Sequence, residues 1–180
     1  MYWSIPLALS IITTAPAAQP FGAWTGNWRG TVSDSLSGST KQSTVMLNLY
    51  PAISGDYTEF RLSMDVRGAT RRDVRLFVHH GTGATPYRAW LFVENVARPT
   101  ELLGSMKDKT LTLLSVTDKD APNAKPERVV VTFSSTEKMT FTISRKLNDE
   151  WIRRLTATVT KPKSRFSAPE PVENETARPR

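Results

Sequence analysis

The sequence predicts an all-β protein, an antiparallel up-and-down β-barrel of about 8–10 strands, with a β-sandwich as the alternative. Short segments in which apolar and polar residues alternate recur between residues 24 and 160, and turn residues separate them. No window shows the apolar stripe of an amphipathic helix. Because strands with one apolar face must bury it, they require closure into a barrel or a second sheet.

Ten segments are expected as strands. In chain order they are residues 24–32, 43–50, 59–67, 73–80, 87–95, 101–106, 110–117, 127–134, 138–145 and 151–160. The third is the clearest, since Phe60, Leu62 and Met64 share one face while charged and hydroxyl residues share the other. The same alternation places the following residues on inward faces: Val45, Leu47 and Leu49; Val74, Leu76 and Val78; Met139, Phe141 and Ile143; and Trp151, Leu155, Ala157 and Val159.

The connections between these segments favour the barrel. Residues 107–109 and 136–137 are expected to form tight hairpins, and a short turn is expected near 147–150. Short connections place consecutive strands side by side and antiparallel. A sandwich usually needs long crossovers, and only the loop at residues 118–126 is a candidate for one.

Composition limits the class of protein. The chain has 180 residues, a net charge of +7, 39% hydrophobic residues and no Cys. One domain of this length buries a sizeable core. The absence of Cys excludes a disulfide scaffold, a thiol enzyme and any Cys-ligated metal site.

Both ends of the chain differ from its middle. Residues 1–17 lack charged side chains, contain an apolar run and end in a small-x-small site, which predicts a signal peptide and a secreted or periplasmic protein. The apolar run is too short to span a bilayer. Residues 161–180 are rich in Pro and charge and predict a disordered tail. The barrel domain is therefore expected at residues 18–160.

The first strand has an unusual inward face. Trp24, Gly26, Trp28, Gly30 and Val32 are expected to share it. Glycine weakens a strand, so its presence beside large rings indicates crowding or a sharp bend.

Gly22-x-Trp24, at the start of this strand, resembles the Gly-x-Trp opening of the lipocalins and their calycin relatives. The extended pattern Gly22-x-Trp24-x-Gly26 is similar to that of the secreted bacterial lipocalin-like barrels. The resemblance implies that an Arg from a late strand packs across the opening Trp. Arg153 alternates in phase with Trp151 and Leu155, so it is expected to point inward and to close the barrel with Gly22 and Trp24.

Few residues suggest chemistry. His79 and His80 are adjacent on a strand and point to opposite faces, so they do not chelate one metal ion, and no metal site is predicted. His80 is expected at the rim of the barrel, with haem ligation as the less favoured alternative. No Gly-x-Ser-x-Gly elbow and no carboxylate pair are present, and we expect a protein without catalytic activity.

The inward apolar face is the leading candidate site, because a barrel of this size either fills its interior or holds one small ligand. The sequence favours a binding protein for a small apolar or amphipathic ligand. The candidate ligand-binding residues are Trp24, Trp28, Leu62, Met64, Met139, Phe141, Ile143 and Arg153.

The alternative is an interaction or inhibitor protein that uses a basic barrel face and the tail to dock an anionic or protein partner. Basic residues cluster at 71–75, 145–146, 153–154 and 161–165. Nucleic-acid binding is not favoured, because Trp90 and Phe92 beside Arg88 are the one hint of aromatics interleaved with basic residues. A monomer is expected.

Overall fold

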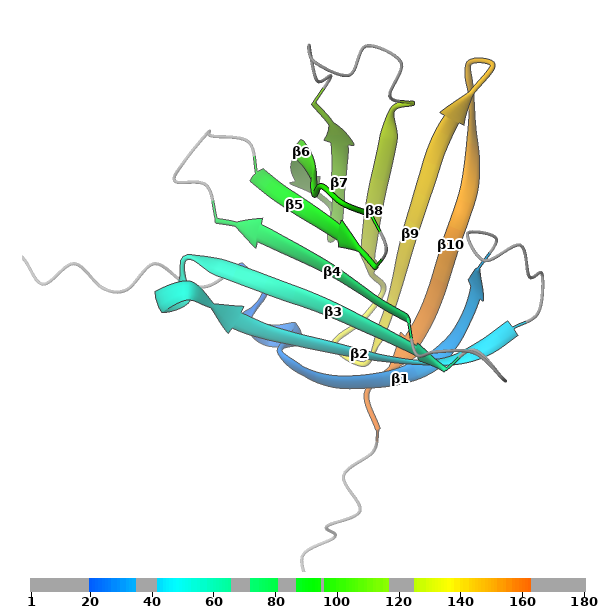
Figure 1. The fold of residues 1–180 in the computed structure, drawn as a ribbon. Coiled ribbons are helices and arrows are strands. Elements are labelled where there is room, and N and C mark those ends of the chain that lie inside the picture. The colour runs from blue at the N-terminus through cyan, green and yellow to red at the C-terminus, as the bar shows by residue number, and fades with distance from the viewer. Residues whose placement is uncertain are drawn as a thin grey trace, which may run out of the picture.

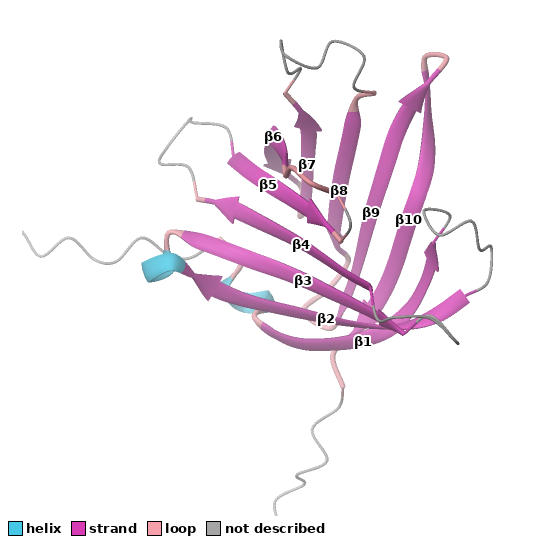
Figure 2. Cartoon of the chain, in the orientation of Figure 1, coloured by secondary structure: helices cyan, strands magenta, loops and turns pink. Residues whose placement is uncertain are grey.

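The computed structural model describes residues 20–34, 42–65, 72–80, 87–94, 96–116 and 125–162. These residues form a closed antiparallel barrel of ten strands with two short 3-10 helices (Figures 1 and 2). The elements are η1 (Gly22–Trp24), β1 (Gly26–Asp34), β2 (Gln42–Ala52), η2 (Ile53–Gly55), β3 (Tyr57–Asp65), β4 (Arg72–His79), β5 (Tyr87–Val93), β6 (Thr100–Lys107), β7 (Thr110–Ser115), β8 (Glu127–Phe133), β9 (Lys138–Leu147) and β10 (Glu150–Thr160). The predicted signal peptide and all of the predicted tail after Pro162 lie outside the described residues.

Each strand pairs with its neighbours along the chain, and β1 pairs with β10 to close the ring. Strands β7 and β8, on either side of the loop that was the candidate crossover, are antiparallel neighbours. The barrel is therefore confirmed over the sandwich. In Figure 1, β2 to β4 run across the view while β8 to β10 run upright, so the strand direction turns around the barrel, as the twist of a closed sheet requires.

The period-two pattern predicted which side chains enter the core. Phe60, Leu62 and Met64 of β3 are fully buried, and so are Val74, Leu76 and Val78 of β4 and Met139 and Phe141 of β9. The buried residues form one continuous cluster inside the barrel. Burial of apolar area on this scale is the main source of stability for such a fold.

Two hairpins use left-handed turn residues. Asp108 and Lys109 have φ of 47° and 61°, and Asn148 and Asp149 have φ of 47° and 64°. Positive φ at both central residues matches the right-handed twist of the paired strands. These are the turns expected near residues 107–109 and 147–150.

Gly30 marks a close approach of two strands. A Cβ built on Gly30 would overlap the carbonyl oxygen of Thr158 and lie 2.8 Å from the Cα of Val159. Because Gly30 pairs with Val159, strand β10 leaves no room for a side chain at this point. The crowding predicted for the first strand is therefore present at Gly30.

The first strand begins at Gly26 rather than at Trp24, so the prediction that Trp24 is a strand residue was wrong. Residues Gly22 to Trp24 form η1, closed by hydrogen bonds from Trp24 N–H to Phe21 O (3.0 Å) and from Thr25 N–H to Gly22 O (3.2 Å). Gly26 then adopts φ of 130° as the chain enters β1. Such a φ is readily available only to glycine, so Gly26 separates the helical turn from the strand.

A bulge in β10 corrects the orientation of Arg153. The register pairs Arg153 with Ser144 and Leu155 with Ile143, so the pairing with β9 shifts by one residue at Arg154. An extra residue reverses the alternation on one side of a bulge. Arg153 is consequently exposed rather than inward, and Trp151 lies on the outer face against Arg128.

Candidate functional site

An aromatic plug closes one end of the barrel. Phe21 is 1% exposed, and its ring centre lies 5.5 Å from that of Phe60, 5.8 Å from Phe133 and 6.0 Å from Tyr87. These rings come from β3, β8 and β5, so Phe21 bridges across the barrel rather than along one strand. We call this the aromatic end.

Trp24 and Trp28 complete the aromatic end. The ring of Trp24 stacks on Phe133 at 4.2 Å, and its indole N–H donates to the carbonyl of Ser135 (3.2 Å). The indole N–H of Trp28 donates to the carbonyl of Trp24 (3.0 Å). Trp24 therefore packs against the core from η1, although it lies outside the strand.

The cation that lies over Trp28 at this end is Lys161, not Arg153. The Lys161 ammonium lies 5.1 Å from the ring centre of Trp28 and donates to the carbonyl of Ala23 (3.3 Å). Arg153 lies on the outer surface near the start of β10, at the other end of the barrel. The predicted closing cluster therefore named the wrong cation: Arg153 is not beside Gly22 and Trp24.

The predicted ligand-binding residues other than Trp24 and Arg153 lie together in the core. Each is at most 2% exposed: Trp28, Leu62, Met64, Met139, Phe141 and Ile143. Side chains with so little accessible surface contact neighbours on all sides. Their part in ligand binding stays a prediction.

The opposite end carries a polar network on the inward face. Glu127 of β8 accepts hydrogen bonds from Nε (3.2 Å) and Nη2 (2.6 Å) of Arg145 on β9. The Thr100 hydroxyl lies 3.4 Å from the second carboxylate oxygen of Glu127, and the Glu127 N–H donates to the hydroxyl of Ser115 (2.9 Å). Four consecutive strands, β6 to β9, thus meet in one network, and we call this the charged end.

The ion pair of the charged end is unequally buried. The Glu127 side chain is 14% exposed and that of Arg145 is 37% exposed. Two guanidinium nitrogens serve Glu127, and Arg145 has further N–H donors. A partly buried, charge-assisted pair of this kind is stronger than an exposed one.

The sequence interpretation missed Glu127 and Arg145 as a pair. The signal was present, because Glu127 is in phase with the buried Val129 and Val131, and Arg145 with Ile143 and Phe141. When the inward faces of two adjacent strands finish in residues of opposite charge, an ion pair is expected between them at that end of the barrel.

His80 lies at the rim of the aromatic end, as predicted. Its Nε2 is 2.7 Å from the Thr58 hydroxyl, and its ring lies 5.7 Å from that of Phe21. Burial, with a smaller contribution from His79, lowers the pKa of His80, and Asp56 partly opposes this. Haem ligation through Nε2 would require the loss of the hydrogen bond to Thr58. Among the described residues, no three His, Asp or Glu side chains are grouped as a metal ion needs.

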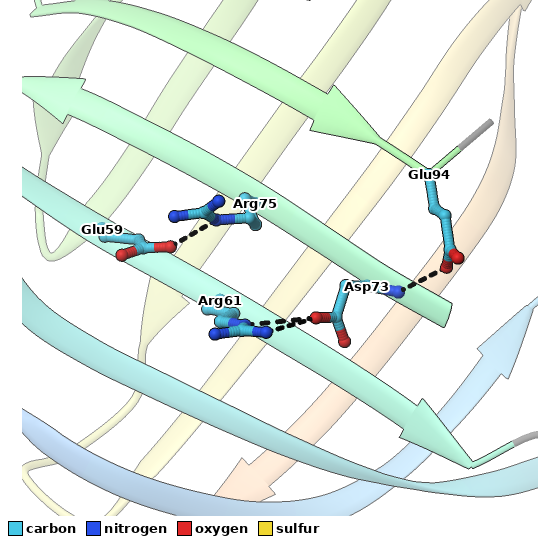
Figure 3. A network of polar contacts seen from close by, with 5 residues as sticks. All are labelled: Glu59, Arg61, Asp73, Arg75 and Glu94. Atoms are coloured by element: carbon cyan, nitrogen blue, oxygen red, sulfur yellow. Dashed lines mark hydrogen bonds and ion pairs between the residues drawn. The ribbon is translucent and has the colours of Figure 1, made fainter. Parts of the chain in front are cut away.

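Ion pairs neutralise much of the outer face over β3 to β5 (Figure 3). Arg61 donates twice to Asp73 (2.7 and 3.2 Å), and Arg75 donates to Glu59 (2.6 Å). Glu94 accepts from the backbone N–H of Asp73 (3.1 Å). The hydrogen bonds that Arg61 donates to Asp73, together with the negative charge of Asp73, raise the pKa of Arg61. This part of the surface is balanced in charge, so it does not account for the net +7 of the chain.

Comparisons with known proteins support the fold alone. No protein-family profile matches the sequence, and no curated protein matches it. The crystal structure of Rv2717c from M. tuberculosis is similar, with a TM-score of 0.55 and 12% identity over 83% of this chain and 99% of that chain. A redesigned β-barrel matches with a TM-score of 0.42 and 10% identity over 83% of this chain and 100% of its own. The described residues thus form a ten-stranded antiparallel barrel, which has a structural neighbour of the same barrel kind. Within the part of the chain that the structure describes, there is no helix with the length and hydrophobicity of a membrane span.

Proposed function

We propose that this barrel is a binding protein for a small amphipathic ligand with an acidic group, and that it catalyses no reaction. The difference between the two barrel ends carries the proposal. Phe21 and Trp24 plug the aromatic end, whereas Glu127 and Arg145 place charge on the inward face of the other end. An amphipathic molecule matches this gradient, with its apolar part toward the core and its polar part at the charged end.

Arg145 is the group expected to meet the acidic part of the ligand. It is the more exposed partner of the ion pair and keeps N–H donors beyond the two that serve Glu127. Glu127 would hold the guanidinium in place, so the site is preorganised. A carboxylate or phosphate binds such a guanidinium through charge-assisted hydrogen bonds.

Ile152 and Met64 are expected to adjust around the apolar part. Ile152 pairs with Arg145 at the charged end and is 41% exposed. Met64 is fully buried near the end of β3, at the same end of the barrel. Methionine has an unbranched, adaptable side chain, so Met64 is able to move for a ligand at low cost.

We also propose that the protein is a calycin-like barrel that is secreted or periplasmic. The Gly22-x-Trp24 opening at the aromatic end and the composition of residues 1–17 support this. N-terminal sequencing of the protein from the extracellular or periplasmic fraction of its host tests it. A chain that begins after Ala17 or Ala18 is expected, and an uncleaved cytoplasmic chain would contradict it.

Binding of a fluorescent fatty acid, compared with that of the matching fluorescent alcohol, tests the ligand proposal. We expect the purified barrel to bind the acid at least tenfold more tightly than the alcohol. Arg145→Gln should remove most of that difference, because it removes the charge that recognises the acid. Arg29→Gln, an exposed arginine on β1, is the matched control and should leave binding unchanged. Absence of acid binding, or equal binding by the Arg145→Gln variant, would refute the proposed site.

A further inference from the structure

The outer face carries a row of side chains that the ligand proposal does not use. Strand register places Arg88, Leu103, Leu114 and Arg128 directly opposite one another, in that order, on β5, β6, β7 and β8. Arg88 and Leu103 alternate with the buried Ala89 and Leu102, so the row faces outward. We call these four residues the outer row.

The centre of the outer row is apolar and exposed. Leu103 is 39% exposed and Leu114 is 47% exposed, and Val116, which follows β7, is 42% exposed. On most strands of this barrel, polar residues occupy the outward positions. Leu103 and Leu114 lie directly opposite each other in the strand register, so their exposed parts form one small apolar patch on the outer face.

Arginines held on tryptophan rings flank this centre on both sides. The Arg88 guanidinium lies 5.3 Å from the ring centre of Trp90, and that of Arg128 lies 4.6 Å from Trp151. Stacking on a ring fixes a guanidinium while leaving its N–H edge available. The two arginines therefore present preorganised donors at the two ends of the outer row.

The two arginines differ in their carboxylate partners. Arg88 donates through Nε to Glu101 (2.6 Å), with a 55% exposed side chain that retains its other donors. Arg128 has no carboxylate partner within the described residues, and its buried Nε has no hydrogen-bond partner there. Among the described residues, the outer row thus carries more positive than negative charge, chiefly at Arg128.

We propose that the outer row docks an extended acidic peptide segment of a partner protein, with two carboxylates four residues apart and an apolar residue midway between them. Arg88 and Arg128 are separated by three strand spacings, about 14 Å at the backbone. Residues i and i+4 of an extended peptide are about 13–14 Å apart, and residues i, i+2 and i+4 face the same side. The carboxylates then reach the two arginines while the middle residue packs on Leu103 and Leu114.

Charge favours this occupant over a second copy of the chain. The net charge is +7, and a symmetric contact through the outer row would bring like-charged arginines together. Glu101, paired with Arg88 at 2.6 Å, adds a negative charge beside the row, which a continuous anionic surface such as a bilayer would repel. The proposed peptide, unlike a bilayer, has negative charge only at the two positions that face Arg88 and Arg128.

Nuclear magnetic resonance titration tests the proposal on the folded protein. The probe is the peptide acetyl-Ser-Glu-Ser-Leu-Ser-Glu-Ser-amide, and its Gln-for-Glu counterpart is the matched control. We expect chemical-shift changes at the methyls of Leu103 and Leu114 with the acidic peptide, and at least fivefold weaker binding for the Gln peptide. Arg128→Gln should weaken binding at least fivefold, whereas Arg29→Gln should not.

Four results would overturn the proposal. They are no shift at these leucines at millimolar peptide, equal binding of the two peptides, shifts produced only by phosphatidylglycerol vesicles, and self-association through this face in sedimentation. The test is independent of the ligand at the charged end, because Arg145→Gln should leave the peptide titration unchanged.

Discussion

The ammonium group of Lys161 lies over the ring of Trp28, 5.1 Å from its centre, and donates a hydrogen bond to the carbonyl of Ala23. Lys161 follows the last residue of β10, and Ala23 belongs to η1 before β1. One side chain therefore links the first and last elements of the barrel beside the seam where β1 pairs with β10. The residue belongs to the segment that composition alone assigned to the tail.

Replacing Lys161 with Met should lower the free energy of unfolding by about 0.5–2 kcal/mol, because the variant loses the contact of the cation with the ring and the hydrogen bond to Ala23. Urea denaturation monitored by tryptophan fluorescence measures the change. Lys161→Arg keeps the cation and should recover at least half of the loss. Equal stability of wild type and Lys161→Met would show that the seam does not depend on this contact.

Phe21→Ala should destabilise the protein by about 3–5 kcal/mol, since it leaves a cavity among rings from three strands. Calorimetry should record a lower melting temperature. Val96→Ala, at a position 58% exposed, is the control and should change stability by less than about 0.5 kcal/mol. A Phe21→Ala loss no larger than this control would mean that residues before β1 do not plug the barrel.

Gly30→Ala should destabilise the barrel by about 1–3 kcal/mol or more, because the added methyl group overlaps the backbone of β10. Gly104→Ala should behave in the same way, as its Cβ would overlap the carbonyl of Thr112. Chemical denaturation of both variants is the measurement. Ser105→Ala, on an exposed neighbour of Gly104, is the control. Wild-type stability in both glycine variants would mean that the strands do not approach so closely.

Stability should depend on His80 as the pH falls. Burial lowers the pKa of His80 in the folded state, so between that value and the unfolded value of about 6.5 the unfolded chain binds more protons. Stability is therefore greatest above pH 6.5 and decreases as the pH falls through this interval. Urea midpoints from pH 7.5 to 5.0 should show a larger loss for wild type than for His80→Gln. Parallel curves for the two proteins would contradict the role of His80.

Much of the fold was predictable because strand periodicity is local. Phe60, Leu62 and Met64 follow one another at every second position, and no neighbouring strand is needed to recognise that pattern. All ten expected segments are strands, with ends that differ by a few residues. Gly30 was predictable as a crowded position for the same reason, since an inward glycine in a strand indicates a close approach.

The errors at Trp24 and Arg153 share one cause. Both predictions extended a strict alternation across a place where the backbone departs from it, the 3-10 turn before Gly26 and the bulge at Arg154. A single extra residue reverses every side chain on one side of it. The position of such an extra residue is decided by hydrogen bonding to the neighbouring strand. The sequence of one strand alone therefore does not reveal it.

Residue alternation alone was enough to predict an antiparallel barrel of about 8–10 strands and most of its core, because burial of alternate side chains depends on near neighbours along one strand. The side chains that meet across strands became visible only in the folded barrel. Glu127 reaches Arg145, Lys161 reaches Trp28, and Arg88 and Arg128 flank two leucines in one outer row. These contacts depend on the register between separate strands and on closure of the barrel. Several strand registers are compatible with each local pattern, and only the complete barrel distinguishes them.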